Sequence, residues 1–325
     1  MRPFSLLVKP AGADCNLTCP YCFYRSRASL HSSPHPRMGE ALLARIVESY
    51  RDLPIPVHSI AFQGGEPTLM GEGFFRRAAE LGAGVDFSLQ TNATLVTDSL
   101  ARFLAESGWL VGVSPHGDTP EFRRGYRRLV EAGADVSVLQ LVTNREVGRP
   151  EAVYSYLADE LGCRFHQYIE CTWPEEFAVG SGEWGDFMVR VFDEWRRRGD
   201  ERRVSVRTFD SIAAELATGA PSLCQFANDC RHHLVVEANG DVYPCDFFVR
   251  PELRLGNVAT DSWEKIVDSP AYAQFGARKR GYPDCPRSGH ALDEGWRRLY
   301  AHAVPHLRRL VEATSFSPKT TQVLV

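Results

Sequence analysis

The chain has 325 residues, of which 44% are hydrophobic and 24% charged, and its formal net charge is −4. This composition is typical of a globular protein, and the lack of a basic excess argues against nucleic-acid binding. Such a length suits a barrel with an appended smaller domain. No apolar run is long enough to cross a membrane, so we expect no membrane partner.

The cysteine content bears on the cellular compartment. Met1–Phe4 leads directly into a strand-like segment, which predicts that there is no secretory signal. In an unsecreted chain, nine cysteines favour metal-binding thiolates over disulfides. We therefore expect a cytoplasmic protein.

Short apolar runs alternate with longer amphipathic stretches in the first half of the chain. The predicted strands are Leu6–Pro10, Ser59–Gln63, Asp86–Gln90, Leu110–Ser114, Val136–Thr143 and Phe165–Glu170. The predicted helices are Gly39–Arg51, Gly73–Leu81, Asp98–Ser107, Glu121–Ala132 and Glu151–Leu161. Such alternation indicates parallel strands with right-handed crossovers. Six units are too few for the eight-unit barrel, so we expect an α/β fold, an open partial (β/α)6 barrel with its active site at the carboxyl ends of the strands.

The loop after the first predicted strand carries Cys15, Cys19 and Cys22 at the spacing C-x3-C-x2-C. Thiolates at this spacing select zinc, copper or an iron–sulfur cluster. A structural zinc site would need a fourth ligand close by, and the next histidine is His31, beyond an arginine-rich loop. Because iron–sulfur clusters normally take four cysteines, three would leave one iron open. Structural cysteines in a buried turn are the alternative.

A second motif, Gly64-Gly65-Glu66-Pro67, follows the second predicted strand. Adjacent glycines allow the backbone to approach a ligand closely, and Glu66 with the nearby carbonyls can meet a cationic amine. A plain Gly-Gly turn is the alternative.

The cysteine loop, with Tyr21 before its last cysteine and the glycine motif one βα unit later, resembles the radical S-adenosylmethionine (SAM) superfamily. This resemblance implies a 4Fe-4S cluster on the three cysteines, whose open iron is chelated by S-adenosyl-L-methionine. Ser114 is a candidate for the ribose hydroxyls and Arg124 for the cofactor carboxylate, against a helix cap and a solvated helix face as alternatives. The implied cofactor-binding residues are Gly64, Gly65, Glu66, Asn92, Ser114 and Arg124.

Residues 171–210 form a bridge with an amphipathic helix over Glu183–Arg198 and a strand-like Val204–Arg207. Beyond it, Asn239-Gly240 between alternating apolar runs predicts a β-hairpin. We expect a barrel domain over 1–210, bridge included, and a smaller domain over 211–325. The smaller domain is predicted to contain helices near Trp263–Val267 and Asp293–Glu312. Cys163 and Cys171 are interpreted as small buried hydrophobic residues.

The predicted hairpin would return Cys245 toward Cys224 and Cys230, with Cys285 farther on. This segment resembles the SPASM-type module, which holds auxiliary iron–sulfur clusters. The order of motifs over residues 5–285 is similar to that of the anaerobic sulfatase-maturating enzymes, which oxidise a Cys or Ser side chain of a sulfatase peptide to formylglycine.

That similarity implies an unfolded sulfatase segment as substrate and an external low-potential electron donor such as flavodoxin or ferredoxin. By motif position, Asp210 is the general base, with Tyr24 and Gln63 as helpers. A helix N-cap role for Asp210, ahead of Ser211–Ala217, is the alternative.

Two departures from the family pattern leave other functions open. The segment Ser114–Asp118 is shorter than the family's substrate-facing loop, and only Cys285 remains of its late cysteine cluster. Four cysteines could hold one auxiliary 4Fe-4S cluster, but not two. Another ribosomal peptide, or a small molecule such as an aminocyclitol or sugar, is the alternative substrate. A degenerate cluster- and SAM-binding relative without catalysis is the third reading, which the intact motifs disfavour.

Overall fold

The structure is a computed structural model that describes residues 1–220, 222–224, 227, 229–278 and 294–313. The chain divides into two compact units. Among the described residues, the first unit contains 1–136 and 229–278, and the second contains the rest. The first unit is thus assembled from two separate stretches of the sequence, and the expected domain boundary near residue 210 stays a prediction.

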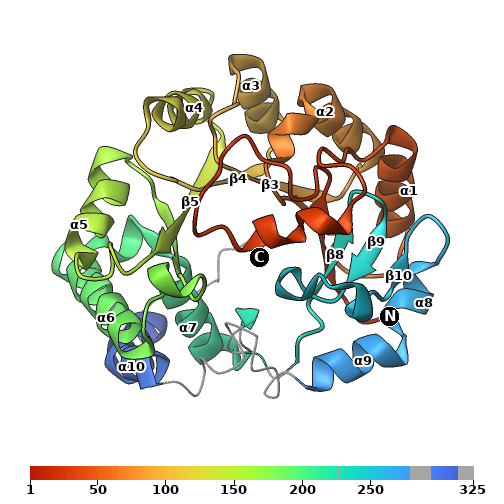
Figure 1. The fold of residues 1–325 in the computed structure, drawn as a ribbon. Helices are drawn as coiled ribbons and strands as arrows, with labels where there is room; N and C mark the ends of the chain where they lie inside the picture. The colour runs from red at the N-terminus through yellow and green to blue at the C-terminus, as the bar shows by residue number, and fades with distance from the viewer. Residues whose placement is uncertain (221, 225–226, 228, 279–293, 314–325) are drawn as a thin grey trace. The chain divides into compact units, whose positions relative to one another are not determined.

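Seven strands described in the first unit follow the order β10-β9-β8-β1-β2-β3-β4 (Figure 1). Strands β8, β1, β2, β3 and β4 are parallel, whereas β9 and β10 are antiparallel to their neighbours. Their bounds are β1 Ser5–Lys9, β2 Ser59–Phe62, β3 Asp86–Thr91, β4 Leu110–Val113, β8 His233–Glu237, β9 Asp241–Tyr243 and β10 Gly256–Asn257.

The first four predicted strands are confirmed to within one residue at each end. Leu6, Leu7 and Val8 of β1 are all fully buried, so side chains on both faces of the strand are covered. Parallel strands with both faces covered have nearly continuous apolar sequences, which is the pattern that these runs show.

Four helices connect the successive parallel strands and lie outside them in Figure 1. Each buries one apolar stripe, as Leu43, Ile46, Val47 and Tyr50 do in the first helix. The corresponding predictions are confirmed with shifts of one residue at some ends. Their bounds are α1 Glu40–Arg51, α2 Glu72–Leu81, α3 Asp98–Glu106 and α4 Pro120–Glu131.

The predicted hairpin is formed by β8 and β9, and Gly240 at its turn has a φ of +87°. Strand β8 also pairs in parallel with β1, in a register that places Lys9 beside Glu237. The hairpin therefore extends the sheet of the barrel strands, which the sequence analysis did not predict. Short elements follow it: η7 Asp246–Phe248, η8 Pro251–Leu253, α8 Trp263–Val267 and α9 Pro270–Ala277.

In the second unit, strand β6 (Phe165–Glu170) pairs in parallel with β5 (Asp135–Val142) and with β7 (Ser205–Val206). The predicted helix over Glu151–Leu161 is α5 (Pro150–Ser155) continued by η3 (Tyr156–Glu160). The bridge and terminal helices are confirmed as α6 (Ser181–Arg197) and α10 (Glu294–Ala313).

These two helices approach closely where two glycines meet. A Cβ on Gly185 would lie 2.5 Å from the Cα of Gly295, so only glycine fits there. No described helix combines the length and the apolar character that a membrane crossing requires.

The first residue of α7 (Arg207–Thr218) decides whether Asp210 is a helix N-cap, the alternative to its role as the base. The helix begins at Arg207, so the strand predicted over Val204–Arg207 is shorter than expected, and Asp210 lies in the first helical turn. The N-cap reading is therefore wrong. Burial of Thr208 and Phe209 explains the earlier start, because both pack into the core of this unit as helical residues.

Candidate active site

The loop that follows β1 carries three half-buried free cysteines, Cys15, Cys19 and Cys22. Burial raises the pKa of the Cys15 and Cys19 thiols, and the charges of neighbouring cysteines raise it further. Thiolates placed like this repel one another, and binding a cationic metal centre relieves the repulsion and releases the protons. Three sulfurs within electrostatic range on one loop fit a cluster with one open iron.

The glycine motif packs on the backbone of this cysteine loop. Gly65 N donates to Gly12 O, and Glu66 N donates to Asp14 O, both at 2.8 Å. A Cβ on Gly65 would lie 1.8 Å from Asp14 O, and Gly64 has a φ of +129°. The glycines are therefore required for contact between this motif and the cysteine loop, in addition to any ligand that they approach.

Glu66 is 1% exposed, and its carboxylate accepts four hydrogen bonds. Oε1 accepts from Thr68 N at 3.0 Å, Thr68 Oγ1 at 2.6 Å and Thr91 Oγ1 at 2.7 Å. Oε2 accepts from Asn92 N at 2.8 Å. Burial raises the pKa of Glu66, and these hydrogen bonds oppose the rise. The carboxylate thus joins the ends of β2 and β3, and its contact with the cofactor amine stays a prediction.

Asn92 connects the end of β3 to the cysteine loop. Its Nδ2 donates to Asn16 Oδ1 at 2.9 Å and lies 3.8 Å from Cys15 Sγ. Thr94 Oγ1 accepts from Asn16 Nδ2 at 2.8 Å and donates to Asn92 Oδ1 at 2.7 Å. Asn16 and Thr94 were missed in the sequence analysis, although both lie within two residues of predicted site residues.

Ser114 is buried at the end of β4, and its Oγ accepts a hydrogen bond from Gln90 Nε2 at 2.8 Å. The helix-cap alternative for Ser114 is wrong, because the side chain of Thr119 caps α4. Ser114 therefore lies at the carboxyl edge of the sheet with a polar partner from β3, and its contact with ribose stays a prediction.

Two other predicted residues differ in exposure. Gln63 is half-buried and its backbone N donates to Val8 O at 2.9 Å, which places it at the carboxyl end of β2. Arg124 is exposed on α4 and pairs with Glu121 at 3.0 Å. Its surroundings are those of a solvated helix face, and its role toward the cofactor carboxylate stays a prediction.

A second group of polar side chains is buried where β1, η1 (Phe23–Leu30) and β8 meet. The Nζ of Lys9 lies 4.4 Å from the ring centroid of Tyr24, whose hydroxyl donates to Glu237. His31 Nε2 lies 2.9 Å from the other carboxylate oxygen of Glu237. Burial lowers the pKa of Lys9 and raises that of Tyr24 well above its ordinary value. Of these residues, only Tyr24 was predicted from the sequence to be a site residue.

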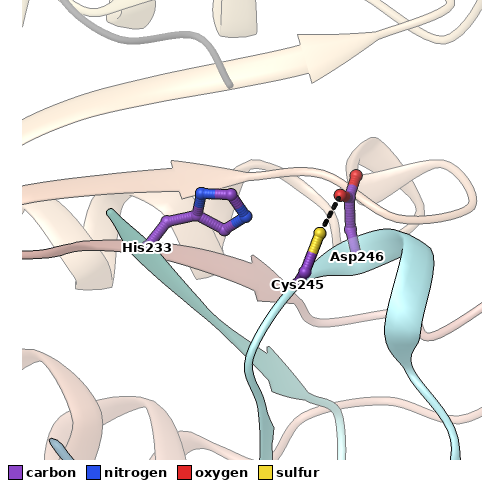
Figure 2. Close-up of side chains that lie close together, drawn as sticks. All are labelled: His233, Cys245 and Asp246. Atoms are coloured by element: carbon purple, nitrogen blue, oxygen red, sulfur yellow. Dashed lines mark hydrogen bonds between the residues drawn. The ribbon is translucent and has the colours of Figure 1, made fainter. Parts of the chain in front are cut away.

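Figure 2 shows His233, Cys245 and Asp246, whose nitrogen, sulfur and oxygen donor atoms all lie within 4.8 Å of one another. Cys245 Sγ is 3.7 Å from Asp246 Oδ1. The charges of Asp246, Cys245 and Cys22 all act on Lys9, so one predicted ligand from each cysteine motif lies within electrostatic range of this amine. Asp246 was missed in the sequence analysis, although it directly follows a predicted ligand.

The remaining predicted residues are distributed over both units. Cys230 belongs to the first unit and half-buried Cys224 to the second, whereas Cys285 lies outside the described residues. Asp210, also in the second unit, accepts a hydrogen bond from Ser205 Oγ. Cys163 and Cys171 are buried, as predicted.

Comparison with known proteins identifies the family. The profile of the Radical SAM superfamily matches residues 10–143, and that of the SPASM iron–sulfur cluster-binding domain matches residues 224–287. The serine-type anaerobic sulfatase-maturating enzyme of Bacteroides thetaiotaomicron is 30% identical over an alignment that covers 86% of this chain and 78% of that protein. The cysteine-type enzyme of Clostridium perfringens (strain ATCC 13124) is 32% identical, covering 85% and 83%. The chain belongs to the anaerobic sulfatase-maturating enzymes.

Solved structures agree with this family assignment. Native anSMEcpe with bound AdoMet and Cp18Cys peptide matches with a TM-score of 0.83 and 28% identity, over 96% of this chain and 99% of that one. This sulfatase-maturating family member therefore has the radical SAM fold, a partial (β/α)6 barrel, together with a SPASM module. Its cofactors are a 4Fe-4S cluster and S-adenosyl-L-methionine, and its SPASM domain is of the kind that binds auxiliary iron–sulfur clusters.

Proposed function

We propose that this enzyme oxidises a Cys or Ser side chain in an unfolded sulfatase segment to formylglycine. The observation that carries the proposal is its similarity, at 30% and 32% identity, to a serine-type and a cysteine-type maturating enzyme over most of each chain. Because the two sequence identities are nearly equal, they do not indicate whether the target residue is Cys or Ser. The intact cysteine loop and the glycine motif packed on it support the same chemistry.

When bound, the cluster and S-adenosyl-L-methionine supply a 5′-deoxyadenosyl radical. The target side chain loses one hydrogen atom from its β-carbon to the radical, one proton to a base and one electron to an acceptor. Serine then becomes an aldehyde directly. Cysteine becomes a thioaldehyde, which water converts to the aldehyde with release of hydrogen sulfide.

Different residues around the cysteine loop would hold the cluster, bind the cofactor and contact the peptide. Cys15, Cys19 and Cys22 would hold the cluster, and the glycine motif with Asn92 and Ser114 would shape the cofactor side of the cleft. Asn92 supports this role because its amide reaches toward Cys15 Sγ, while its own backbone is held by Glu66. Gln63 would face the peptide, whereas Tyr24, which is 2% exposed, would act as a helper from beneath the site.

Two carboxylates are candidates for the base. Asp210 was predicted from motif position and lies half-buried in α7. Asp246 is 8% exposed, follows Cys245 directly, and its charge acts on both Lys9 and Tyr24. Because Tyr24 and Gln63 belong to the same compact unit as Asp246, we favour Asp246 as the base.

The two electrons would take separate routes. A flavodoxin or ferredoxin in the cytoplasm would deliver the first electron to the radical SAM cluster. Cys224, Cys230, Cys245 and Cys285 would hold one auxiliary 4Fe-4S cluster, which would supply an acceptor for the second electron. Four cysteines match the ligand requirement of a single cluster.

The test uses anaerobically reconstituted protein, dithionite and S-adenosyl-L-methionine, with peptides that carry Cys, Ser or Ala at the target position of a C-x-P-x-R motif. We expect equal amounts of 5′-deoxyadenosine and formylglycine from the Cys or the Ser peptide, and no formylglycine from the Ala peptide. The C19A variant should form neither product.

Two outcomes would contradict the proposal differently. Formation of 5′-deoxyadenosine without any change in peptide mass would reject the sulfatase substrate and favour another peptide or an aminocyclitol. Failure of the wild-type protein to form 5′-deoxyadenosine would reject radical catalysis itself.

A further inference from the structure

Glu237 has no role in the function proposed above, yet it is 1% exposed and both of its carboxylate oxygens have side-chain partners. One oxygen accepts from the Tyr24 hydroxyl, and the other lies 2.9 Å from His31 Nε2. Both partners come from the segment that directly follows Cys22. The carboxylate therefore links the chain beyond the cysteine loop to the end of β8.

The sheet register explains why these groups meet. In the parallel pair β1–β8, Lys9 is the register partner of Glu237, so their side chains leave neighbouring strands on the same face. Lys9 Nζ lies 4.4 Å from the Tyr24 ring centroid, whereas Glu237 accepts from the hydroxyl of the same ring. Tyr24 is thus held on its face by one strand and at its polar end by the next.

Apolar packing confines the ring but leaves its polar end dependent on Glu237. Tyr24 belongs to a buried cluster with Leu7, Val235 and Tyr243, against which Cys22 is also packed. Loss of the carboxylate would leave the buried phenol without its acceptor, which favours a shift of the hydroxyl toward another partner. A displacement of about 1 Å in a positioned group can reduce a rate by roughly 100-fold.

We propose that Glu237 is a positioning residue that fixes the hydroxyl of Tyr24 in the active site, with His31 holding the second carboxylate oxygen. The proposal rests on the proposed function, in which the buried Tyr24 is a helper of the oxidation. Glu237 itself acts only through Tyr24.

Two substitutions separate the hydrogen bond from the negative charge. E237Q removes the charge and keeps a carbonyl oxygen that accepts from Tyr24. Its amide N–H can donate to His31 Nε2 once that ring carries its proton on Nδ1. E237L removes both bonds at similar size. We expect E237Q to stay within about threefold of wild-type kcat and E237L to lose roughly 10- to 100-fold. E237L should also form more 5′-deoxyadenosine per formylglycine, with unchanged iron content.

A double-mutant cycle tests whether the effect passes through Tyr24. Y24F should lose as much activity as E237L, and Y24F/E237L should be no slower than the slower single variant. Y154F is the matched control, because the Tyr154 hydroxyl donates to the buried carboxylate of Asp200 at 2.7 Å in the second unit. It should keep the wild-type product ratio.

Three results would overturn the positioning role. The first is a wild-type ratio of 5′-deoxyadenosine to formylglycine in E237L. The second is a fold-loss of activity in Y24F/E237L equal to the product of the two single-variant losses. The third is an E237Q variant as slow as E237L. A wild-type enzyme that forms no formylglycine would instead overturn the proposed function. In that case the positioning role is decided by urea unfolding of the reconstituted variants. Midpoint shifts of Y24F and E237L that do not add would support it, and additive shifts would reject it.

Discussion

Gly65 lies against the backbone of Asp14 so closely that a Cβ at position 65 would be 1.8 Å from the Asp14 carbonyl oxygen. The hydrogen bonds from Gly65 N and Glu66 N to the cysteine loop accompany this contact. The glycine motif therefore supports the loop that carries Cys15, Cys19 and Cys22. Its two glycines are needed for that support whatever cofactor contacts they also make.

Substitution of Gly65 by alanine should displace the cysteine loop. Because the clash is with backbone atoms, it cannot be relieved by a rotamer change, and we expect G65A to cost roughly 3 kcal/mol or more of stability. Iron per chain after reconstitution and the rate of 5′-deoxyadenosine formation should both fall. G73A is the matched control, because a Cβ on Gly73 meets nothing within 4 Å. Normal iron content in G65A would contradict this reading.

Glu66→Gln should weaken cofactor binding by loosening Asn92. The carboxylate accepts four hydrogen bonds, and a glutamine amide nitrogen in place of one oxygen would face donors that it cannot accept from. We expect a loss of roughly 3 kcal/mol of stability and a higher KM for S-adenosyl-L-methionine. E80Q removes the charge of an exposed glutamate and should change neither quantity. An unchanged KM in E66Q would show that Asn92 is held without the carboxylate.

The choice of base is tested with two asparagine variants. D246N should lower the rate of formylglycine formation by at least about 100-fold while 5′-deoxyadenosine still forms, because only proton removal is lost. D210N should keep a rate near that of wild type. The reverse pattern would restore Asp210 as the base, and the measurement is single-turnover formation of both products.

His166 should make the second unit sensitive to acid. Its Nε2 donates to Cys163 O at 3.0 Å and its Nδ1 accepts from the Tyr168 hydroxyl at 3.2 Å, so the folded protein holds the neutral ring. Burial lowers the pKa of His166 to about 4 from the usual 6.5. The unfolded chain therefore binds the proton at higher pH, and stability is fully present above pH 6.5 and falls as the pH decreases toward 4.

The loss from this single histidine amounts to about 3 kcal/mol. Urea unfolding between pH 7 and pH 4 measures it, with H166Q as the control that lacks the titrating ring. A pH dependence of the unfolding free energy in H166Q as steep as that of wild type would assign the acid sensitivity to other groups.

The parts of the fold that could be predicted depend on local patterns. Continuous apolar runs identified β1 to β4, and Asn239-Gly240 identified the hairpin, because turn chemistry and burial are recorded in neighbouring residues. Pairing of β8 with β1 could not be predicted in this way. It joins residues more than 220 positions apart, and no local pattern encodes that partner choice.

The candidate site likewise combines residues that local sequence patterns predict with residues that only long-range pairing brings together. The cysteine and glycine motifs were evident from spacing, whereas no local pattern distinguished Lys9 within the predicted strand Leu6–Pro10. Its burial follows from the neighbouring β8, which brings Glu237 beside it, and from Tyr24, which covers its amine. Asp246 was missed for the same reason, since its importance arises from the side chains that the hairpin brings together.

The proposed function depends above all on the three loop thiolates, which would hold a cluster whose open iron binds S-adenosyl-L-methionine. Its most direct test is electron–nuclear double resonance on the dithionite-reduced protein, with the methionyl amino group of the cofactor labelled with ¹⁵N. We predict a hyperfine coupling between the cluster spin and the label that is absent in C19A. A reduced cluster without this coupling, or zinc or a disulfide at these cysteines, would contradict the account.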